Sequence, residues 1–209
     1  MEVLWNRPET TRATLVLAHG AGAPMDSGFM ADMAARLGDR GLAVMRFEFP
    51  YMARRRETGK KSPPDRSPVL LESFHEQLEA LGNSESVFIG GKSLGGRMAS
   101  MLATEVKVAG VVALGYPFHP PGKPERTRLD HLPDLRAPML ICQGERDPLG
   151  HRSEVAGYEL PASVQLHWLP DGDHDLKPRK KSGYTHEQNL DDAARAVAAW
   201  VADRQAASG

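Results

Sequence analysis

Ser93 has the neighbours that a catalytic nucleophile needs. Residues 91–95, Gly-Lys-Ser-Leu-Gly, match the G-x-S-x-G pattern of a nucleophile elbow. In this motif, small residues two positions before and two after the serine let a strand and a helix approach each other in a tight turn. The apolar run at 87–89 predicts the strand, and apolar residues at helical spacing over 98–102 predict the helix. The pattern therefore predicts that the Ser93 hydroxyl is presented at the edge of a sheet.

Two other interpretations of this segment exist. Ser93 could cap a helix in a glycine-rich turn, because serine is a favoured N-cap residue. Residues 91–93, Gly-Lys-Ser, also resemble the end of a phosphate-binding P-loop. That motif requires a glycine five positions before Gly91, where this chain has Ser86, and a flexible loop where it has the apolar run at 87–89. We therefore reject the P-loop, and the N-cap remains the simpler alternative.

Asp147 and His174 follow Ser93 in the chain, each directly after a predicted strand, at 138–143 and 164–169. Serine, acid and histidine occur in this order in enzymes built on a nucleophile elbow. His174 would take the Ser93 proton as general base, and Asp147 would hold the imidazole in the required tautomer. The plain alternative is that Asp147 and Pro148 form an ordinary turn.

Other histidines and aspartates compete for these two roles. The alternative histidines are His151, His167 and His186, and the alternative acids are Asp171, Asp173 and Asp175. His167 is expected in mid-strand and His186 at a helix start, which favours structural roles, whereas His151 is close to Asp147. A carboxylate on a neighbouring strand's loop suits the geometry better than one adjacent to His174 in sequence.

A nucleophilic serine also needs two backbone N–H groups that stabilise the developing oxyanion. Leu94, directly after Ser93, would supply one of them and would begin a helix whose positive end lies at the same place. The second donor is expected after the first buried strand, in the segment His-Gly-Ala-Gly at 19–22. We choose Ala21 for this role, with Gly22 as the next candidate, and expect His19 to hold the loop by hydrogen bonding.

The elements that position these residues alternate between strand and helix. Strands are predicted at 13–18, 42–49, 87–89, 108–114, 138–143 and 164–169, and helices at 27–37, 67–81, 94–102, 153–159 and 186–203. A charged loop is expected at 51–66. Alternation of this kind implies a mostly parallel sheet with helices on both faces and ligand chemistry at the carboxyl ends of the strands. We therefore expect a single α/β domain over residues 1–209.

Composition excludes several classes of protein. The chain has 209 residues, with 26 basic against 27 acidic side chains, so its charge predicts no nucleic-acid partner. Its one cysteine, Cys142, lies in an apolar run, which predicts an inert core residue and excludes an internal disulfide framework or a cysteine-based zinc site. No apolar run approaches membrane-spanning length, and the first residues do not resemble a signal peptide. A cytoplasmic protein without a membrane partner is expected.

Six segments together resemble a known family. They lie at 17–27, 46–52, 90–97, 115–124, 143–148 and 172–178, and include Arg-Phe-Glu-Phe-Pro-Tyr-Met, Gly-Gly-Lys-Ser-Leu-Gly-Gly-Arg and Gln-Gly-Glu-Arg-Asp-Pro. They resemble the bacterial branch of an α/β-hydrolase family that includes a testis-expressed vertebrate protein and the hydrolase-like domain of the third subunit of the nonspecific lethal chromatin complex. The resemblance implies the α/β-hydrolase fold and the Ser93, Asp147, His174 assignment. Dienelactone hydrolases are similar more loosely, because their nucleophile is cysteine.

Basic residues are concentrated in three loops that leave the carboxyl ends of strands. They are Arg54, Arg55, Arg56, Lys60, Lys61 and Arg66; Lys123, Arg126 and Arg128; and Lys177, Arg179, Lys180 and Lys181. This placement favours a positive rim and an acidic substrate, although solvated loop charges are the simpler explanation. Nearby aromatic residues such as Phe49 are expected to form pocket walls. The expected substrate-binding residues are Tyr51, Lys92, Tyr116, Phe118 and Arg54.

The segment between the strands that end at Leu114 and begin at Pro138 is short and proline-rich, so no helical lid or cap domain is expected. The sequence therefore predicts a serine hydrolase of the carboxylesterase type. It would cleave an ester, thioester or lactone bond of a small-molecule substrate through an acyl-enzyme on Ser93, with no cofactor and no metal. The second hypothesis is a non-catalytic hydrolase-like domain that binds an anionic partner.

Overall fold

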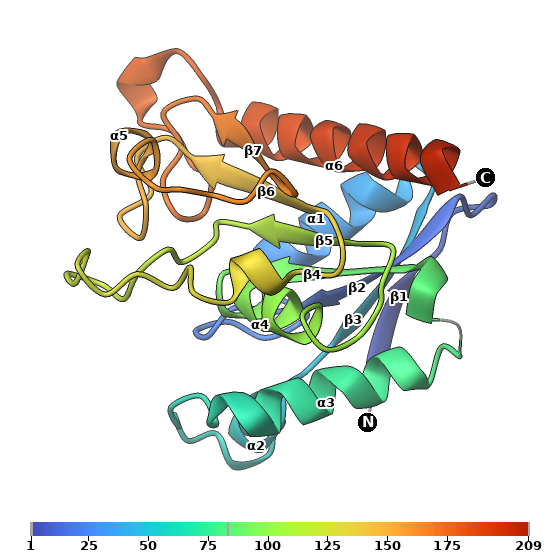
Figure 1. Cartoon of the computed structure of the whole chain (residues 1–209). Coiled ribbons are helices and arrows are strands. Elements are labelled where there is room, and N and C mark those ends of the chain that lie inside the picture. Colours follow the sequence, from blue (N-terminus) through green and yellow to red (C-terminus); the bar gives the residue numbers. More distant parts are fainter. Residues whose placement is uncertain (1, 83, 209) are drawn as a thin grey trace.

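One mixed sheet forms the centre of the molecule (Figure 1). Within the residues described by the computed structural model, 2–82 and 84–208, seven strands pair in the order β1-β3-β2-β4-β5-β6-β7. The strands are β1 (Val3–Asn6), β2 (Ala13–Ala18), β3 (Leu42–Phe47), β4 (Val87–Lys92), β5 (Gly110–Leu114), β6 (Met139–Gly144) and β7 (Val164–Leu169). β1 runs antiparallel to β3, and all the other pairs are parallel. The expected mostly parallel sheet is confirmed.

Helices cover both faces of this sheet, as predicted. They are α1 (Gly28–Gly38), α2 (Pro50–Thr58), α3 (Ser67–Glu79), α4 (Leu94–Leu102), α5 (Arg152–Val155) and α6 (His186–Ser208). α1 and α6 pack together on one face, and α3 and α4 on the other, with α2 beside α3 (Figure 1).

The alternation of side chains along each strand explains why two cores form. In β2, Leu15 and Leu17 point into the core that is shared with α1 and α6. Val16 and Ala18 point into the opposite core, which is shared with α2, α3 and α4. A strand that is covered on both faces needs a continuous apolar run rather than an alternating one, and this run is what the sequence shows.

Several features differ from the sequence-based expectation, including the bounds of β3, β4, β5 and α3. β1 was not predicted, because a short antiparallel edge strand carries little pattern of its own. The loop expected at 51–66 begins as helix α2, which has Pro50 in its first turn and ends at Thr58; Gly59 follows with a φ of +68°. α5 is shorter than the helix predicted at 153–159, and α6 runs beyond residue 203.

The connection between β5 and β6 contains no α-helix among its described residues. Its one regular element is a 3₁₀ turn at Leu132–Asp134, and residues 121–127 are all exposed. The expected absence of a cap domain between these strands therefore agrees with the structure. Over the described ranges, no helix has the length and apolar character needed to cross a membrane.

A half-buried histidine within this connection predicts a pH-dependent stability. His131 Nε2 lies 2.8 Å from Ser100 Oγ, and burial together with the charge of Arg97 lowers the pKa of His131 to about 4. In the unfolded chain the pKa is about 6.5, so the unfolded state binds more protons between these two values. Stability should therefore fall as the pH drops from about 6.5 to about 4, by about 1–2 kcal/mol after allowance for partial exposure.

Urea unfolding at pH 7 and pH 4.5 measures this contribution. His131→Gln should reduce the difference in stability between the two pH values, whereas His75→Gln, at a more exposed position on α3, should leave it unchanged. Equal pH dependence in the wild type and in both variants would contradict the prediction.

Candidate active site

Ser93 lies in the turn between β4 and α4, and its backbone has a conformation that few non-glycine residues adopt. Its φ is +50° and its ψ is −111°, which places a non-glycine residue at positive φ. The turn is held by β5 and by α4, since the Ser93 N–H donates to the Leu114 carbonyl at 3.0 Å and the Ser93 carbonyl accepts from the Arg97 N–H at 3.0 Å. Strain of this kind is typical of functional sites, and here it separates an elbow from a simple helix N-cap, for which no side-chain cap hydrogen bond is present.

Steric contacts explain why two positions of the motif are glycine. A Cβ at Gly91 would lie 2.5 Å from the Ala18 carbonyl oxygen of β2. A Cβ at Gly95 would collide with the same oxygen. The strand and the helix can therefore meet beside β2 only if both positions lack a side chain.

Gly91→Ala is accordingly expected to destabilise the fold. Overpacking against backbone atoms that cannot move aside should cost about 1–3 kcal/mol or more. Thermal or urea unfolding measures the loss. Gly28→Ala is the matched control, because a Cβ there meets nothing within 4 Å. Similar stability for the two variants would contradict the steric explanation.

Three side chains from separate strand ends meet in one hydrogen-bonded triad. His174, in the loop after β7, has its Nε2 2.8 Å from Ser93 Oγ and its Nδ1 2.8 Å from Asp147 Oδ2. Asp147, after β6, is fully buried, whereas the His174 side chain is 26% exposed. A carboxylate only accepts, so Nδ1 carries the proton and Nε2 is free to accept the Ser93 hydroxyl proton. This is the arrangement that activates a serine nucleophile.

Gln143, which was not expected among the site residues, holds Asp147 in place. Its Nε2 lies 3.0 Å from Asp147 Oδ2, and its Oε1 accepts the Tyr116 N–H at 2.7 Å. The Leu149 N–H donates to the other carboxylate oxygen, Oδ1, at 2.8 Å. A polar residue at the end of an apolar strand was the available signal for Gln143, because a buried amide needs partners of this kind.

The loop that carries His174 is fixed by two side chains from other elements. Asn189 of α6 donates through Nδ2 to the carbonyls of Pro170 and Leu176, at 3.0 and 2.8 Å. Lys92 Nζ, at the end of β4, donates to the His174 carbonyl at 2.8 Å and pairs with Asp175 at 3.2 Å. Burial lowers the pKa of Lys92 while the charge of Asp175 partly offsets this effect. These contacts hold the imidazole beside Ser93.

The expected oxyanion donors lie around the nucleophile. Leu94 begins α4, and Ala21 and Gly22 line the same cavity as Ser93. In the described part of the chain, the N–H groups of these three residues donate to no protein acceptor. They are thus available to a ligand atom beside Ser93 Oγ.

Comparison with known proteins identifies the family of the chain. A family model described as an alpha/beta hydrolase domain matches residues 11–202. The chain belongs to the alpha/beta-hydrolase family. Comparison with curated proteins gave no match. The more specific relationship to the testis-expressed protein and to the chromatin-complex subunit stays a prediction.

Solved structures of other α/β-hydrolases share this fold. A dienelactone hydrolase from Anabaena variabilis is 23% identical, with a TM-score of 0.69 over 93% of this chain and 87% of that one. A protein of Xanthomonas campestris, described as an α/β serine hydrolase without a lid, is 19% identical, with a TM-score of 0.69 over 95% and 88%. The esterase domain of a Rhodothermus marinus protein is 18% identical, with a TM-score of 0.66 over 96% and 91%.

The alternative histidines of this α/β-hydrolase bind elsewhere. His151 caps α5 by accepting the Glu154 N–H, and His167 lies 3.1 Å from Asp192. His186 Nε2 contacts a backbone carbonyl at 2.9 Å. In the described residues, none of them contacts Ser93.

The alternative acids also have other partners. Asp171 binds Arg179, and the hydrogen bond from the Arg179 side chain lowers the pKa of Asp171 to about 2. Asp173 Oδ1 accepts the N–H groups of Asp175 and Lys177 in the turn itself. Asp147 is therefore the carboxylate that the structure brings to the His174 ring.

A cavity of about 380 Å³ opens directly above Ser93 in this α/β-hydrolase. Its lining residues are Gly20, Ala21, Gly22, Ala23, Ser27, Phe29, Met30, Lys92, Ser93, His174 and Asp175. Phe29 and Met30 were predicted to form a helix face and were not recognised as cavity residues. They reach it because α1 starts at the carboxyl edge of the sheet, so its first turn faces the nucleophile.

Of the five expected substrate-binding residues, the structure places only Lys92 in this cavity. Tyr51, Tyr116 and Phe118 are fully buried, and none of them lines the cavity. Arg54 is exposed and pairs with Asp65 at 2.6 Å, away from the cavity lining. The expectation was therefore wrong for these four residues. The three aromatic side chains belong to the core and Arg54 has an acidic partner, and the order of residues in a sequence cannot distinguish a core aromatic from a pocket wall. Phe49, also expected as a wall, is likewise a core residue.

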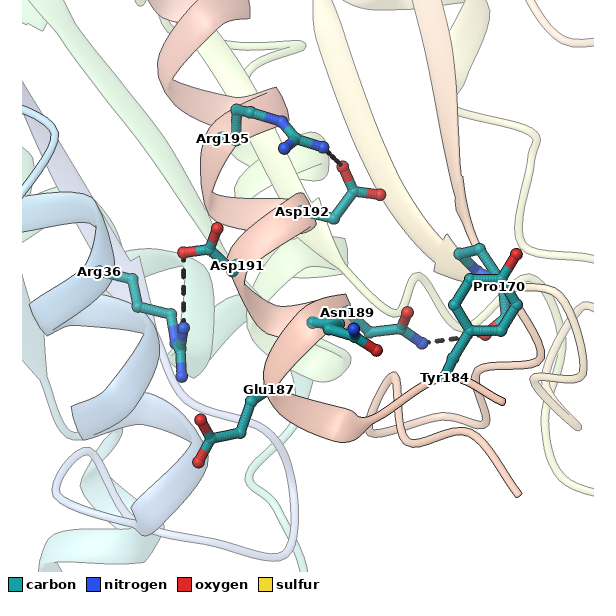
Figure 2. Close-up of a pocket in the computed structure, with 9 residues that line it drawn as sticks. Arg36, Pro170, Tyr184, Glu187, Asn189, Asp191, Asp192 and Arg195 are labelled. Carbon is teal, nitrogen blue, oxygen red and sulfur yellow. Dashed lines mark hydrogen bonds and ion pairs between the residues drawn. The ribbon is translucent and has the colours of Figure 1, made fainter. Parts of the chain in front are cut away.

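A second pocket of this α/β-hydrolase lies along α6 and is also lined by Arg36 of α1 and by Pro170 and Tyr184 of the loop after β7 (Figure 2). Arg36 faces Asp191 across it, and Arg195 pairs with Asp192. Its charged side chains thus largely neutralise one another, and the triad lies outside it. Within the described residues, no group of three or more metal-binding side chains occurs.

Proposed function

We propose that this α/β-hydrolase is a serine hydrolase that cleaves an ester-type bond, in a carboxylester, a thioester or a lactone. The observation that carries the proposal is the hydrogen-bonded contact of His174 with both Ser93 Oγ and Asp147, at 2.8 Å each. The descriptions of the Xanthomonas and Rhodothermus proteins as a serine hydrolase and an esterase support it as analogy.

In the proposed reaction, Ser93 Oγ attacks the substrate carbonyl carbon while His174 Nε2 takes the hydroxyl proton. The negative charge that forms on the carbonyl oxygen is stabilised by the N–H groups of Leu94 and Ala21, with Gly22 adjacent. His174 then returns the proton to the leaving group, and the acyl group remains on Ser93. A water molecule, deprotonated by the same nitrogen, releases the acid and restores Ser93. The sequence of steps needs no cofactor.

The open cavity favours small or extended substrates with an apolar group. Phe29, Met30 and the residues at 20–23 provide its apolar surface, and the connection between β5 and β6 places no α-helix over it. Lys92 brings a positive charge, but Asp175 already pairs with it. Arg54 and Arg56 of the expected positive rim are paired with acidic residues too, which weakens the support for an acidic substrate.

The test is covalent labelling with a fluorophosphonate, which reacts with activated serine hydroxyls. Wild-type protein should be labelled at Ser93, and a panel of aryl esters, thioesters and lactones should then identify the bond that is cleaved. Folded wild-type protein that is not labelled and cleaves none of the panel would favour the non-catalytic binding domain instead.

A further inference from the structure

The oxyanion loop is held from behind by a tyrosine that was expected in the substrate pocket. Tyr51, in the first turn of α2, is fully buried, and its hydroxyl lies 3.3 Å from the Gly20 carbonyl oxygen and 3.1 Å from the Ala21 carbonyl oxygen. Its single proton is thus shared between two consecutive peptide groups. Burial raises the pKa of Tyr51 to about 12, so the hydroxyl remains a donor at neutral pH.

Two further side chains bind the same carbonyls. Arg55, one helical turn along α2, donates through Nη1 to the Ala21 carbonyl at 3.3 Å, and its guanidinium lies 5.1 Å from the centre of the Tyr51 ring. His19 donates through Nδ1 to the Gly20 carbonyl at 2.7 Å, while its Nε2 accepts the Phe49 N–H at 3.1 Å. These partners fix the tautomer of His19, whose pKa is lowered by burial.

The direction of these carbonyls decides the direction of the amide hydrogens. In a trans peptide the C=O and the N–H of one unit point to opposite sides, and no cis peptide occurs in the described residues. The Gly20 carbonyl shares its unit with the Ala21 N–H, and the Ala21 carbonyl shares its unit with the Gly22 N–H. Both carbonyls turn toward buried Tyr51, so both N–H groups turn away from it.

The opposite side of the loop is the cavity above Ser93. Ala21 and Gly22 line that cavity and Tyr51 does not. A Cβ built at Gly20 would lie 3.8 Å from Ser93 Cβ, which shows how closely the loop passes the nucleophile. The N–H groups that point away from Tyr51 therefore lie on the side where an oxyanion would form.

We propose that Tyr51, assisted by Arg55, is a positioning residue for the oxyanion hole. By holding the carbonyls of Gly20 and Ala21 on the buried side, it keeps the amide hydrogens of Ala21 and Gly22 directed at the substrate oxygen. The proposal rests on the serine hydrolase function proposed above. α2 then has a specific task, because it carries both donors that bind the Ala21 carbonyl.

Tyr51→Phe tests the proposal, because it removes the hydroxyl and keeps the ring. An oxyanion donor that is lost outright lowers kcat by about 10²–10³-fold, so a donor that is only less well directed should lower it by about tenfold. Because the effect belongs to the transition state, KM for an aryl ester should change by less than about twofold. The pH profile should stay the same, since the triad is untouched. Affinity for a trifluoromethyl ketone, which forms an oxyanion on Ser93, should fall with kcat.

Tyr158→Phe is the matched control, since this hydroxyl binds Glu154 and lies outside the cavity. It should keep kcat within about twofold of the wild type. Arg55→Met is a second variant that leaves the core aromatic in place; it should lower kcat in the same direction and add to the loss in the double variant. Thermal unfolding shows whether Tyr51→Phe is folded. If it is not, Arg55→Met tests the proposal in its place.

Three outcomes would overturn the proposal. Unchanged kcat and unchanged ketone affinity in folded Tyr51→Phe and Arg55→Met, with an active wild type, would overturn the positioning role alone. A rise in KM at constant kcat would do the same, because it would assign Tyr51 to ground-state binding. A wild type that neither cleaves esters nor reacts with the fluorophosphonate would overturn the serine hydrolase function and this role together.

Discussion

Ser93→Ala is expected to lower kcat for aryl ester hydrolysis by about 10⁶-fold and to abolish fluorophosphonate labelling. The methyl group cannot attack a carbonyl carbon, and His174 then has no hydroxyl to deprotonate. Ser93 is partly exposed at a turn, and its side chain makes no cap hydrogen bond to α4. The variant should therefore fold with near wild-type stability. Steady-state kinetics, labelling and thermal unfolding together measure the three expectations.

The chain offers a control for the serine–histidine contact itself. Ser153 Oγ lies 3.0 Å from His151 Nδ1, but this pair is exposed and has neither a positive-φ elbow nor the cavity around it. Ser153→Ala should therefore retain full activity and full labelling. Labelling that persists in Ser93→Ala and disappears in Ser153→Ala would move the active site to α5.

Asp147→Asn is expected to lower kcat by about 10⁴-fold while the side-chain volume stays the same. In one orientation the new amide NH₂ faces His174 Nδ1 and Gln143 Nε2, so the imidazole takes the wrong tautomer and Nε2 can no longer accept the Ser93 proton. In the other orientation the NH₂ faces the Leu149 N–H, which also donates. Either orientation places donor against donor in a fully buried site.

Kinetics across pH and urea unfolding separate the two costs of this substitution. The loss of kcat should be accompanied by a moderate loss of stability, about 1–3 kcal/mol, from the unpaired donors. Asp203→Asn, at an exposed position of α6, should change neither quantity. Activity within tenfold of the wild type would show that Asp147 does not orient the base.

The fold and the triad could be predicted because their signals are local or ordered. The glycines around Ser93 reflect a contact with the Ala18 carbonyl that tolerates no side chain, so the motif is visible within a few residues. Asp147 and His174 follow from a general rule, since residues after parallel strands collect at one edge of the sheet. Continuous apolar runs marked the strands because both faces are covered.

The remaining features depend on which side chain reaches which atom across the fold. A strand was expected over 42–49, but β3 ends at Phe47 and Pro50 begins α2, so the position of Tyr51 could not be inferred from its neighbours. An aromatic residue after a strand suits a pocket wall and a core equally well, and only packing against β2 and α3 decides between them. The same holds for Gln143, whose partners come from two segments, one after β5 and one after β6.

The exposed segment at 121–127 divides the chain into two parts that carry different residues of the candidate active site. The first part holds the nucleophile and the amide donors, and the second holds the base and the acid, 81 residues from Ser93 in the case of His174. Each fragment produced by a cut in this segment would contain strands of the sheet but only some of the residues that hydrolysis needs. Hydrolysis would then require the fragments to reassemble, which makes the molecule suited to conversion into a split reporter whose signal depends on two fused proteins meeting.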